Sequence, residues 1–247
     1  MATFDDHAKT TLTLYYIVDH RLTTVLSKAS MKILLLLFSL SLSPAAFSQS
    51  QLDSIISANA CNCLTRSATV DEETLATCIL NAFKSDSERI LKECLITYGD
   101  TSEASARKFG LEIYGRLSVS MIRTCDKYAQ VIASIRDDSY RNINLDSIKS
   151  AYKVLISASP QKPSAETFTV EGIIHFKEGE FTAAISSFNK AIQQDSNAFQ
   201  SIYFKAWALE KSGKFDEAIS LYKQLSILTN RQEFILFATL AERNKKR

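Results

Sequence analysis

The residues with the most distinctive chemistry in this sequence are its five cysteines, Cys61, Cys63, Cys78, Cys94 and Cys125. In an exported protein, such a cluster indicates disulfide bonds, and an odd number leaves one thiol unpaired. A metal site would need further ligands at C-x-x-C-like spacing, often with histidine, and a thiol-exchange enzyme would be expected to carry C-x-x-C at a helix start. The single C-x-C therefore favours structural disulfides. Thiol–disulfide exchange by Cys61 and Cys63 is the alternative, enzymatic interpretation.

The pairing of these cysteines stays open between two patterns. In the first, Cys78 faces Cys94 across a helical hairpin, and the C-x-C pair meets Cys125. In the second, Cys61 and Cys63 bond to Cys78 and Cys125, so that Cys94 remains free. We favour the second pattern slightly.

No other group in the sequence predicts catalysis. His175 could serve as a general base, but no serine, cysteine or paired carboxylate stands near it in motif spacing, and no glycine-rich oxyanion loop is present. The acidic clusters at 71–73 and 137–138 are typical of helix ends and solvated surfaces. We therefore predict no catalytic residue, no metal site and no cofactor.

The composition is that of a globular, helical protein. The chain has 247 residues, of which 46% are hydrophobic and 23% are charged, with a net charge of +2. A near-neutral net charge gives no indication of nucleic-acid binding. Only six glycines and three prolines are present, which favours long helices over turn-rich sandwiches and barrels. The expected fold class is all-α.

The N-terminal region contains the pattern of an export signal. Residues 31–48 combine a Met-Lys start, an apolar run and small residues before a cut between Ser48 and Gln49. The apolar run is too short to span a bilayer comfortably, so we expect cleavage, no membrane span afterwards, and a periplasmic or extracellular location. Residues 1–30 precede this signal without a recognisable purpose, and we interpret them as an upstream extension from a mis-assigned start codon.

Apolar stripes at helical spacing predict a disulfide-braced, four-helix bundle over residues 49–138. The first helix covers 52–66, and a long helix covers 102–136. Each of the two helices between them begins with a capping box, Thr69 with Glu72 and Ser85 with Glu88. A connecting helix at 144–158, starting at Asn144, and a proline-containing break then make up a linker over 139–163.

The C-terminal part contains an internal repeat. EGEFTAAISSFNKAI at 178–192 aligns without gaps with SGKFDEAISLYKQLS at 212–226, at an offset of 34 residues. The matching pairs are Gly179 and Gly213, Phe181 and Phe215, Ala184 and Ala218, Ile185 and Ile219, and Phe188 and Tyr222. Paired helices at this period resemble tetratricopeptide repeats. We expect a domain over 164–247 with repeats at 165–198 and 199–232 and a capping helix at 233–246.

The resemblance to tetratricopeptide repeats implies a groove that binds a protein or peptide partner, lined by the first helix of each pair. Carried over residue by residue, the groove positions are Thr169, Ile173, Phe176, Lys177, Tyr203, Trp207, Glu210 and Lys211. The aromatic residues and two lysines suit a peptide with an apolar anchor and an acidic neighbour. Alternatively, Phe176 is a core residue and Trp207 packs against the C-terminal helix. The clamp for chaperone carboxylates is missing, since Thr169 and Ile173 stand where it has lysine and asparagine.

The N-terminal half resembles a group of secreted bacterial helical proteins with a C-x-C near the mature N-terminus. They carry a third cysteine on the next helix and another on a long, glycine-containing helix, here GLEIYGRLSVSMIRTC. The likeness covers about residues 51–135, Cys94 departs from it, and it implies no function. We therefore expect an exported, non-enzymatic protein-interaction module. The alternatives are the exchange enzyme above and a structural envelope component whose repeats bind only its own bundle.

Overall fold

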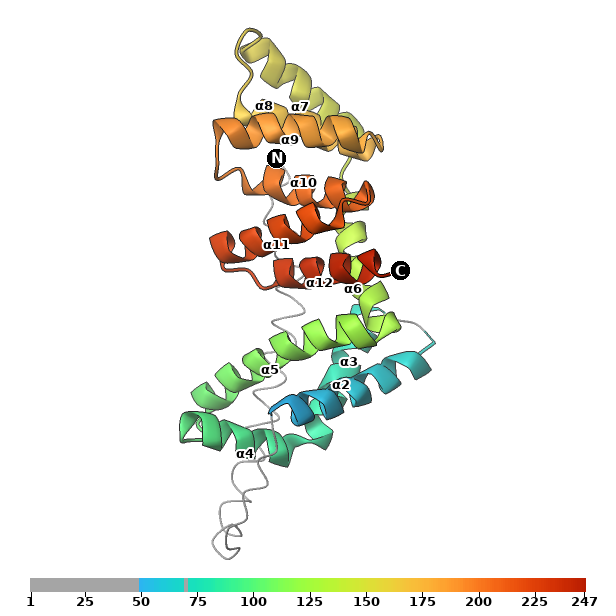
Figure 1. Ribbon diagram of the computed structural model, residues 1–247, viewed down its shortest axis with the longest axis vertical. Helices are drawn as coiled ribbons and strands as arrows, with labels where there is room; N and C mark the ends of the chain where they lie inside the picture. The colour runs from blue at the N-terminus through green and yellow to red at the C-terminus, as the bar shows by residue number, and fades with distance from the viewer. Residues whose placement is uncertain (1–48, 69–70) are drawn as a thin grey trace, which may run out of the picture. The chain divides into compact units, whose positions relative to one another are not determined.

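The computed structural model describes residues 49–68 and 71–247, and within these ranges it contains eleven helices and no strand (Figure 1). The all-α prediction is confirmed. The helices are α2 Gln49–Arg66, α3 Glu72–Ser85, α4 Ser87–Tyr98, α5 Glu103–Thr124, α6 Asp126–Arg141, α7 Leu145–Ala158, α8 Ala165–Lys177, α9 Phe181–Gln194, α10 Phe199–Lys211, α11 Phe215–Thr229 and α12 Glu233–Lys245.

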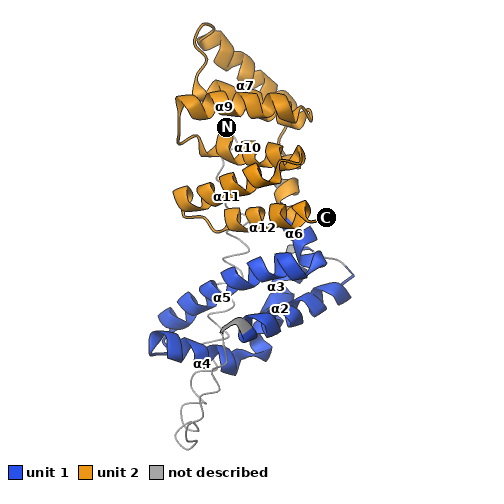
Figure 2. Ribbon diagram, viewed as in Figure 1, with its two compact units in different colours: residues 1–132 blue, residues 133–247 orange. Residues whose placement is uncertain are grey.

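The chain divides into two compact units, and the division falls within α6, between Ile132 and Ala133 (Figure 2). The predicted boundary at residue 138 stays a prediction. The predicted export signal at 31–48, the segment before it and the predicted cap Thr69 all lie outside the described residues. None of the helices that the structure describes combines the length and the apolar character that crossing a membrane requires.

The first unit is a helical bundle in which α2 packs against α3, α4 and α5. Each helix contributes a fully buried apolar side chain to its core, such as Ile56, Leu75, Ile90, Ile113 and Tyr128. Because these residues recur at spacings of three and four along each helix, one stripe per helix faces inward. The predicted bundle is therefore confirmed.

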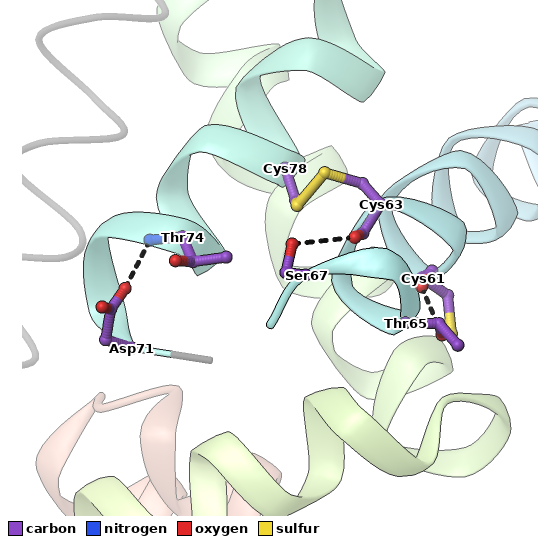
Figure 3. Close-up of a disulfide and its surroundings, with 7 residues drawn as sticks. All are labelled: Cys61, Cys63, Thr65, Ser67, Asp71, Thr74 and Cys78. Carbon is purple, nitrogen blue, oxygen red and sulfur yellow. Dashed lines mark hydrogen bonds between the residues drawn. A yellow bond between two sulfur atoms is a disulfide. The ribbon is translucent and has the colours of Figure 1, made fainter. Parts of the chain in front are cut away.

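The second helix of the bundle begins at a different cap from the one predicted. The Asp71 carboxylate accepts a hydrogen bond of 2.8 Å from the backbone N–H of Thr74 (Figure 3). This bond satisfies one of the backbone donors that a helix start leaves free, which is the usual role of aspartate at this position.

The predicted capping box at Ser85 is wrong. Ser85 is the last residue of α3, and its hydroxyl donates to the carbonyl oxygen of Ala82. Asp86 alone separates α3 from α4, and its carboxylate accepts hydrogen bonds from Asn59 and Arg89. The turn is thus tighter than the sequence pattern suggested, and its buried aspartate ties α2 to α4.

The predicted single helix over 102–136 is also wrong, because it breaks at Cys125. This residue has an extended backbone (φ −119°, ψ 107°), and α5 ends before it while α6 begins after it. The Cys125 sulfur is bonded to Cys61, with the two Cα atoms 5.8 Å apart. The break therefore coincides with the covalent link to α2, which helical periodicity alone does not reveal.

Two disulfides brace the bundle, Cys61–Cys125 and Cys63–Cys78, and Cys94 is free and buried. Figure 3 shows the bond between Cys63 and Cys78. The favoured pairing is confirmed. Residues two apart on a helix point about 200° away from each other, since each residue turns the helix by roughly 100°. Cys61 therefore reaches the junction of α5 and α6, whereas Cys63 reaches α3, and the two cysteines bond to different neighbours.

Thiol counting and unfolding test the two bridges. Without reductant, we expect one reactive thiol, exposed only on unfolding because Cys94 is buried. Replacing Cys63 and Cys78 with serine removes a bridge of sequence separation 15, and replacing Cys61 and Cys125 removes one of separation 64. The expected losses in free energy of unfolding are about 3 and about 4 kcal/mol, measured by urea denaturation. Five reactive thiols in the unreduced, unfolded protein would contradict this account.

In the second unit, α8 packs with α9, α10 with α11, and α12 against α11, so that successive helix pairs stack (Figure 1). The turn inside each pair contains a glycine with positive φ, 80° at Gly179 and 75° at Gly213. That conformation favours glycine because it has no Cβ. These two glycines occupy equivalent repeat positions, and the same backbone conformation accounts for glycine at both.

The predicted equivalence of the two repeats extends to their cores. Ala184 and Ala218 are fully buried, as are the paired rings of Phe188 and Tyr222. Before the first repeat, Asn144 caps α7 as predicted, accepting a bond from the backbone N–H of Ser147. The helix expected to be a connector, α7, packs against α8 within the second unit.

Gly172 lets α8 and α9 approach closely, and its substitution tests this packing. A Cβ at this position would lie 2.6 Å from the Cδ1 atom of Phe188. We expect Gly172→Ala to lower the free energy of unfolding by about 1–3 kcal/mol, because the ring must move. The matched control is Gly110→Ala in α5, where a Cβ meets nothing within 4 Å. There the higher helix propensity of alanine should raise the free energy of unfolding by as much as about 1 kcal/mol. Equal effects of the two substitutions on the urea midpoint would refute the close approach.

Candidate functional site

The C-terminal half of α6 lies on one face of the second unit, which we call the α6-binding face. Helices α8, α10 and α12 contribute to it. Its side chains are Phe176, Lys177, Trp207, Glu210 and Phe237. The contacts from α6 come from Arg136 and Tyr140, which are four residues apart and therefore share one side of the helix.

A buried ion pair forms the centre of this face. The Arg136 guanidinium donates from Nη1 to Glu210 Oε2 at 2.8 Å and from Nη2 to Oε1 at 3.3 Å. The exposed fractions are only 4% and 5% for the two side chains. Glu210 also accepts hydrogen bonds from the Tyr222 hydroxyl at 3.3 Å and the Asn244 amide at 3.2 Å. The carboxylate thus has four donors, which is what a buried charge needs in order to be tolerated.

Aromatic rings complete the surroundings of the guanidinium. The Arg136 Cζ atom lies 4.9 Å from the centre of the Trp207 ring and 5.6 Å from that of Phe237, within the range of cation–π attraction. Burial alone would lower the pKa of Arg136, but neighbouring Tyr222 and Glu210 raise it by more. The net pKa is higher than the ordinary arginine value, and the guanidinium stays charged.

Tyr140 makes the second set of contacts. Its hydroxyl donates to the carbonyl oxygen of Phe176 at 3.2 Å, and its ring meets those of Phe176 and Trp207 edge-on, with centres 5.1 and 5.2 Å apart. The Lys177 ammonium donates to the carbonyl oxygen of Tyr140 at 2.8 Å and lies 4.1 Å from the centre of its ring. Burial raises the pKa of Tyr140 to about 12 and lowers the pKa of Lys177.

Four of the eight predicted groove residues contact α6, namely Phe176, Lys177, Trp207 and Glu210. Phe176 and Trp207 are 2% and 1% exposed, so the alternative that placed Phe176 in the core describes it correctly. Trp207 packs on α6 and on its aromatic neighbours within the unit. In this structure the chain's own helix covers these positions.

The other four predicted groove residues have different surroundings. The Thr169 hydroxyl shares a hydrogen bond of 2.7 Å with that of Ser201, which links the two repeats. Ile173 belongs to the core, and Tyr203 packs among aromatic rings from the second repeat and α12. Lys211 is exposed. Whether any of the eight binds an external partner stays a prediction.

Reasoning from the sequence missed Arg136 and Tyr140, because both fell near the end of a helix assigned to the bundle. One signal could have found them. Glu210 stands in the apolar helix FQSIYFKAWALEK, where a carboxylate on a buried side demands a cation. Arg136 carries that cation 74 positions earlier in the chain, and no local pattern joins residues so far apart.

Comparison with known proteins agrees with this architecture. The tetratricopeptide repeat family matches residues 165–197 and 199–225. The second unit carries tetratricopeptide repeats. A TPR repeat-containing protein of Methanocaldococcus jannaschii is 34% identical over 71 residues, which cover 29% of this chain and 12% of that protein. No solved structure matches the chain significantly.

His175 lies away from the α6-binding face, at the end of the first helix of the first tetratricopeptide repeat. Its Nδ1 atom is 2.7 Å from the carboxylate of Glu180. Together with Glu178, these residues place three possible metal-ligand atoms within 4.8 Å of one another. However, Glu178 already pairs with Lys149 at 2.6 Å, so a metal ion there would have to compete with an ammonium group.

Removing one charge of the buried pair tests its place in the tetratricopeptide unit. Glu210→Gln keeps the shape of the side chain but removes the charge to which the buried Arg136 is doubly hydrogen-bonded, while the longer contact of Arg136 Nε with Asp137 at 3.7 Å remains. We expect the free energy of unfolding to fall by about 3–5 kcal/mol in urea denaturation. The matched control is Glu242→Gln, which breaks the more exposed pair with Lys223 and should cost less than about 1 kcal/mol. Equal losses would show that the pair at Arg136 is not buried in solution.

Proposed function

We propose that this chain is an exported, non-enzymatic protein whose tetratricopeptide unit binds a protein partner through the α6-binding face. The observation that carries the proposal is the buried, doubly hydrogen-bonded pair of Arg136 and Glu210. It shows that this face can hold a helix by specific polar and aromatic contacts. Helix binding of this kind is an established way in which folded domains recognise partners.

Two further observations support the proposal. Disulfides persist in oxidising compartments, so the two bridges of the bundle agree with export by the signal at 31–48. Cys61 and Cys63 are bonded to different helices and not to each other. The two cysteines of this C-x-C therefore do not form the internal disulfide that a thiol-exchange enzyme would use. This favours a structural role for both cysteines.

One observation favours a second candidate, a structural component whose repeats bind only their own chain. In this structure α6 itself covers Phe176, Trp207 and Glu210. The two candidates differ in whether another protein reaches this face in the cell, which an experiment can decide.

Site-specific photo-cross-linking in the native cell tests the proposal. A photoreactive residue replaces Lys211, which is exposed next to Glu210, and the control carries it at the exposed Gln224 of α11. We expect an adduct with another protein from position 211 and none of the same mass from 224, because only the former borders the α6-binding face. Internal products alone from position 211 would favour the structural candidate.

The export part of the proposal has its own readout in the same cells. Fractionation should recover the protein outside the cytoplasm, and N-terminal sequencing should begin at Gln49. An intact N-terminus in the cytoplasmic fraction would refute export while leaving the cross-linking result to stand separately.

A further inference from the structure

We infer that the α6-binding face is a receptor for the C-terminal turn of a helix that carries arginine and, four residues later, an aromatic residue. In this structure α6 occupies the receptor as a tethered ligand, and a partner helix of the same chemistry displaces it. The inference rests on the proposed function and names the class of partner. Four parts of the structure support it.

The first part is the charge that α6 would leave behind. Two of the four hydrogen bonds to Glu210 come from Arg136, and the other two come from Tyr222 and Asn244 of the repeat unit. Withdrawal of α6 therefore leaves a carboxylate in an apolar setting with neutral donors only. Such a group binds a cation strongly because its own hydration is incomplete.

The second part is the shape of the place that the cation fills. The guanidinium lies over the rings of Trp207 and Phe237 while it forks onto both oxygens of Glu210. A planar group with parallel N–H donors fits both contacts together, whereas the compact ammonium of lysine fits only the charge. The receptor therefore selects arginine.

The third part is the end of the helix. Tyr140 is the last residue but one of α6, and its carbonyl oxygen accepts from Lys177 at 2.8 Å. Carbonyl oxygens in the last turn of a helix lack partners within the helix. The Tyr140 oxygen also accepts from the backbone N–H of Ile143 at 3.1 Å, and its second lone pair is available to the lysine. The hydroxyl and ring of the tyrosine add contacts to Phe176 and Trp207. These contacts define the order arginine, three residues, aromatic residue, helix end.

The fourth part is what α6 fails to supply. The Trp207 indole N–H is buried and has no acceptor within the part of the chain that the structure describes. Between the two contacting residues, α6 presents Asp138 to solvent. A partner with an acceptor near the indole gains a hydrogen bond that α6 lacks, and an unpaired buried donor is costly. This difference lets an external helix compete with a tethered one.

A peptide of this chain is the probe for the receptor. Fluorescein-labelled ASIRDDSYRNI, residues 133–143, is titrated by fluorescence anisotropy into the full chain and into its Arg136→Ala/Tyr140→Ala variant. A tethered ligand acts at an effective concentration on the order of millimolar. We therefore expect the variant to bind the peptide at least about ten-fold more tightly than the unaltered chain does.

Matched controls separate specific from general binding. A peptide with lysine in place of Arg136 should bind the variant at least about ten-fold more weakly than the original peptide does. Adding Glu210→Gln to the variant should abolish binding of the original peptide. If circular dichroism shows that the double variant is unfolded, Arg136→Lys replaces it under the same criteria.

Several outcomes would overturn the inference. These are equal binding to the unaltered chain and the variant, no binding to a folded variant, and equal binding of the lysine peptide. A dimer in light scattering with cross-links from position 211 between two copies would assign the face to a second copy of the chain. If the peptide fails while position 211 still captures another protein, only this inference falls. If both fail, the proposed function falls with it.

Discussion

The second unit depends on one buried charge, the carboxylate of Glu210 on α10. A lone ionised group in an apolar interior costs several kcal/mol, so its neighbours must supply both counter-charge and donors. Arg136 supplies the charge from α6, while Tyr222 and Asn244 supply donors from the second repeat and from α12. Three segments far apart in the sequence are thereby held to one side chain.

The same pair explains why α10, the first helix of the second repeat, differs from a plain amphipathic pattern. Both sides of α10 are buried, one against the other repeat helices and one against α6, and its residues from Ala206 to Glu210 are all covered. A helix that is covered nearly all round loses a clear polar face. Glu210, the one charged residue of α10 that is buried, consequently identifies the side on which another helix lies.

Much of the architecture could be predicted from the sequence because it follows from local rules. The repeat offset, the turn glycines Gly179 and Gly213 and the inward cysteines all express periodicity within one or two helices. The misses came from contacts between distant residues. The break at Cys125 accompanies its bond to Cys61, and the covering of the predicted groove by Arg136 depends on a residue in another helix. Neither contact can be recognised from the hydrophobic periodicity of a single helix.

The C-x-C of α2 has a consequence for how the protein matures. In a chain exported as proposed above, from its N-terminus into an oxidising compartment, Cys61 and Cys63 both meet Cys78 before Cys125 arrives. The two candidate rings differ by only two residues in size, so loop entropy hardly discriminates between them. What does discriminate is the coiling of α2, which turns Cys63 toward α3 and Cys61 away from it. Oxidation that is correct at the first attempt, without later thiol–disulfide exchange, therefore requires that this helix has formed before its sulfur atoms react.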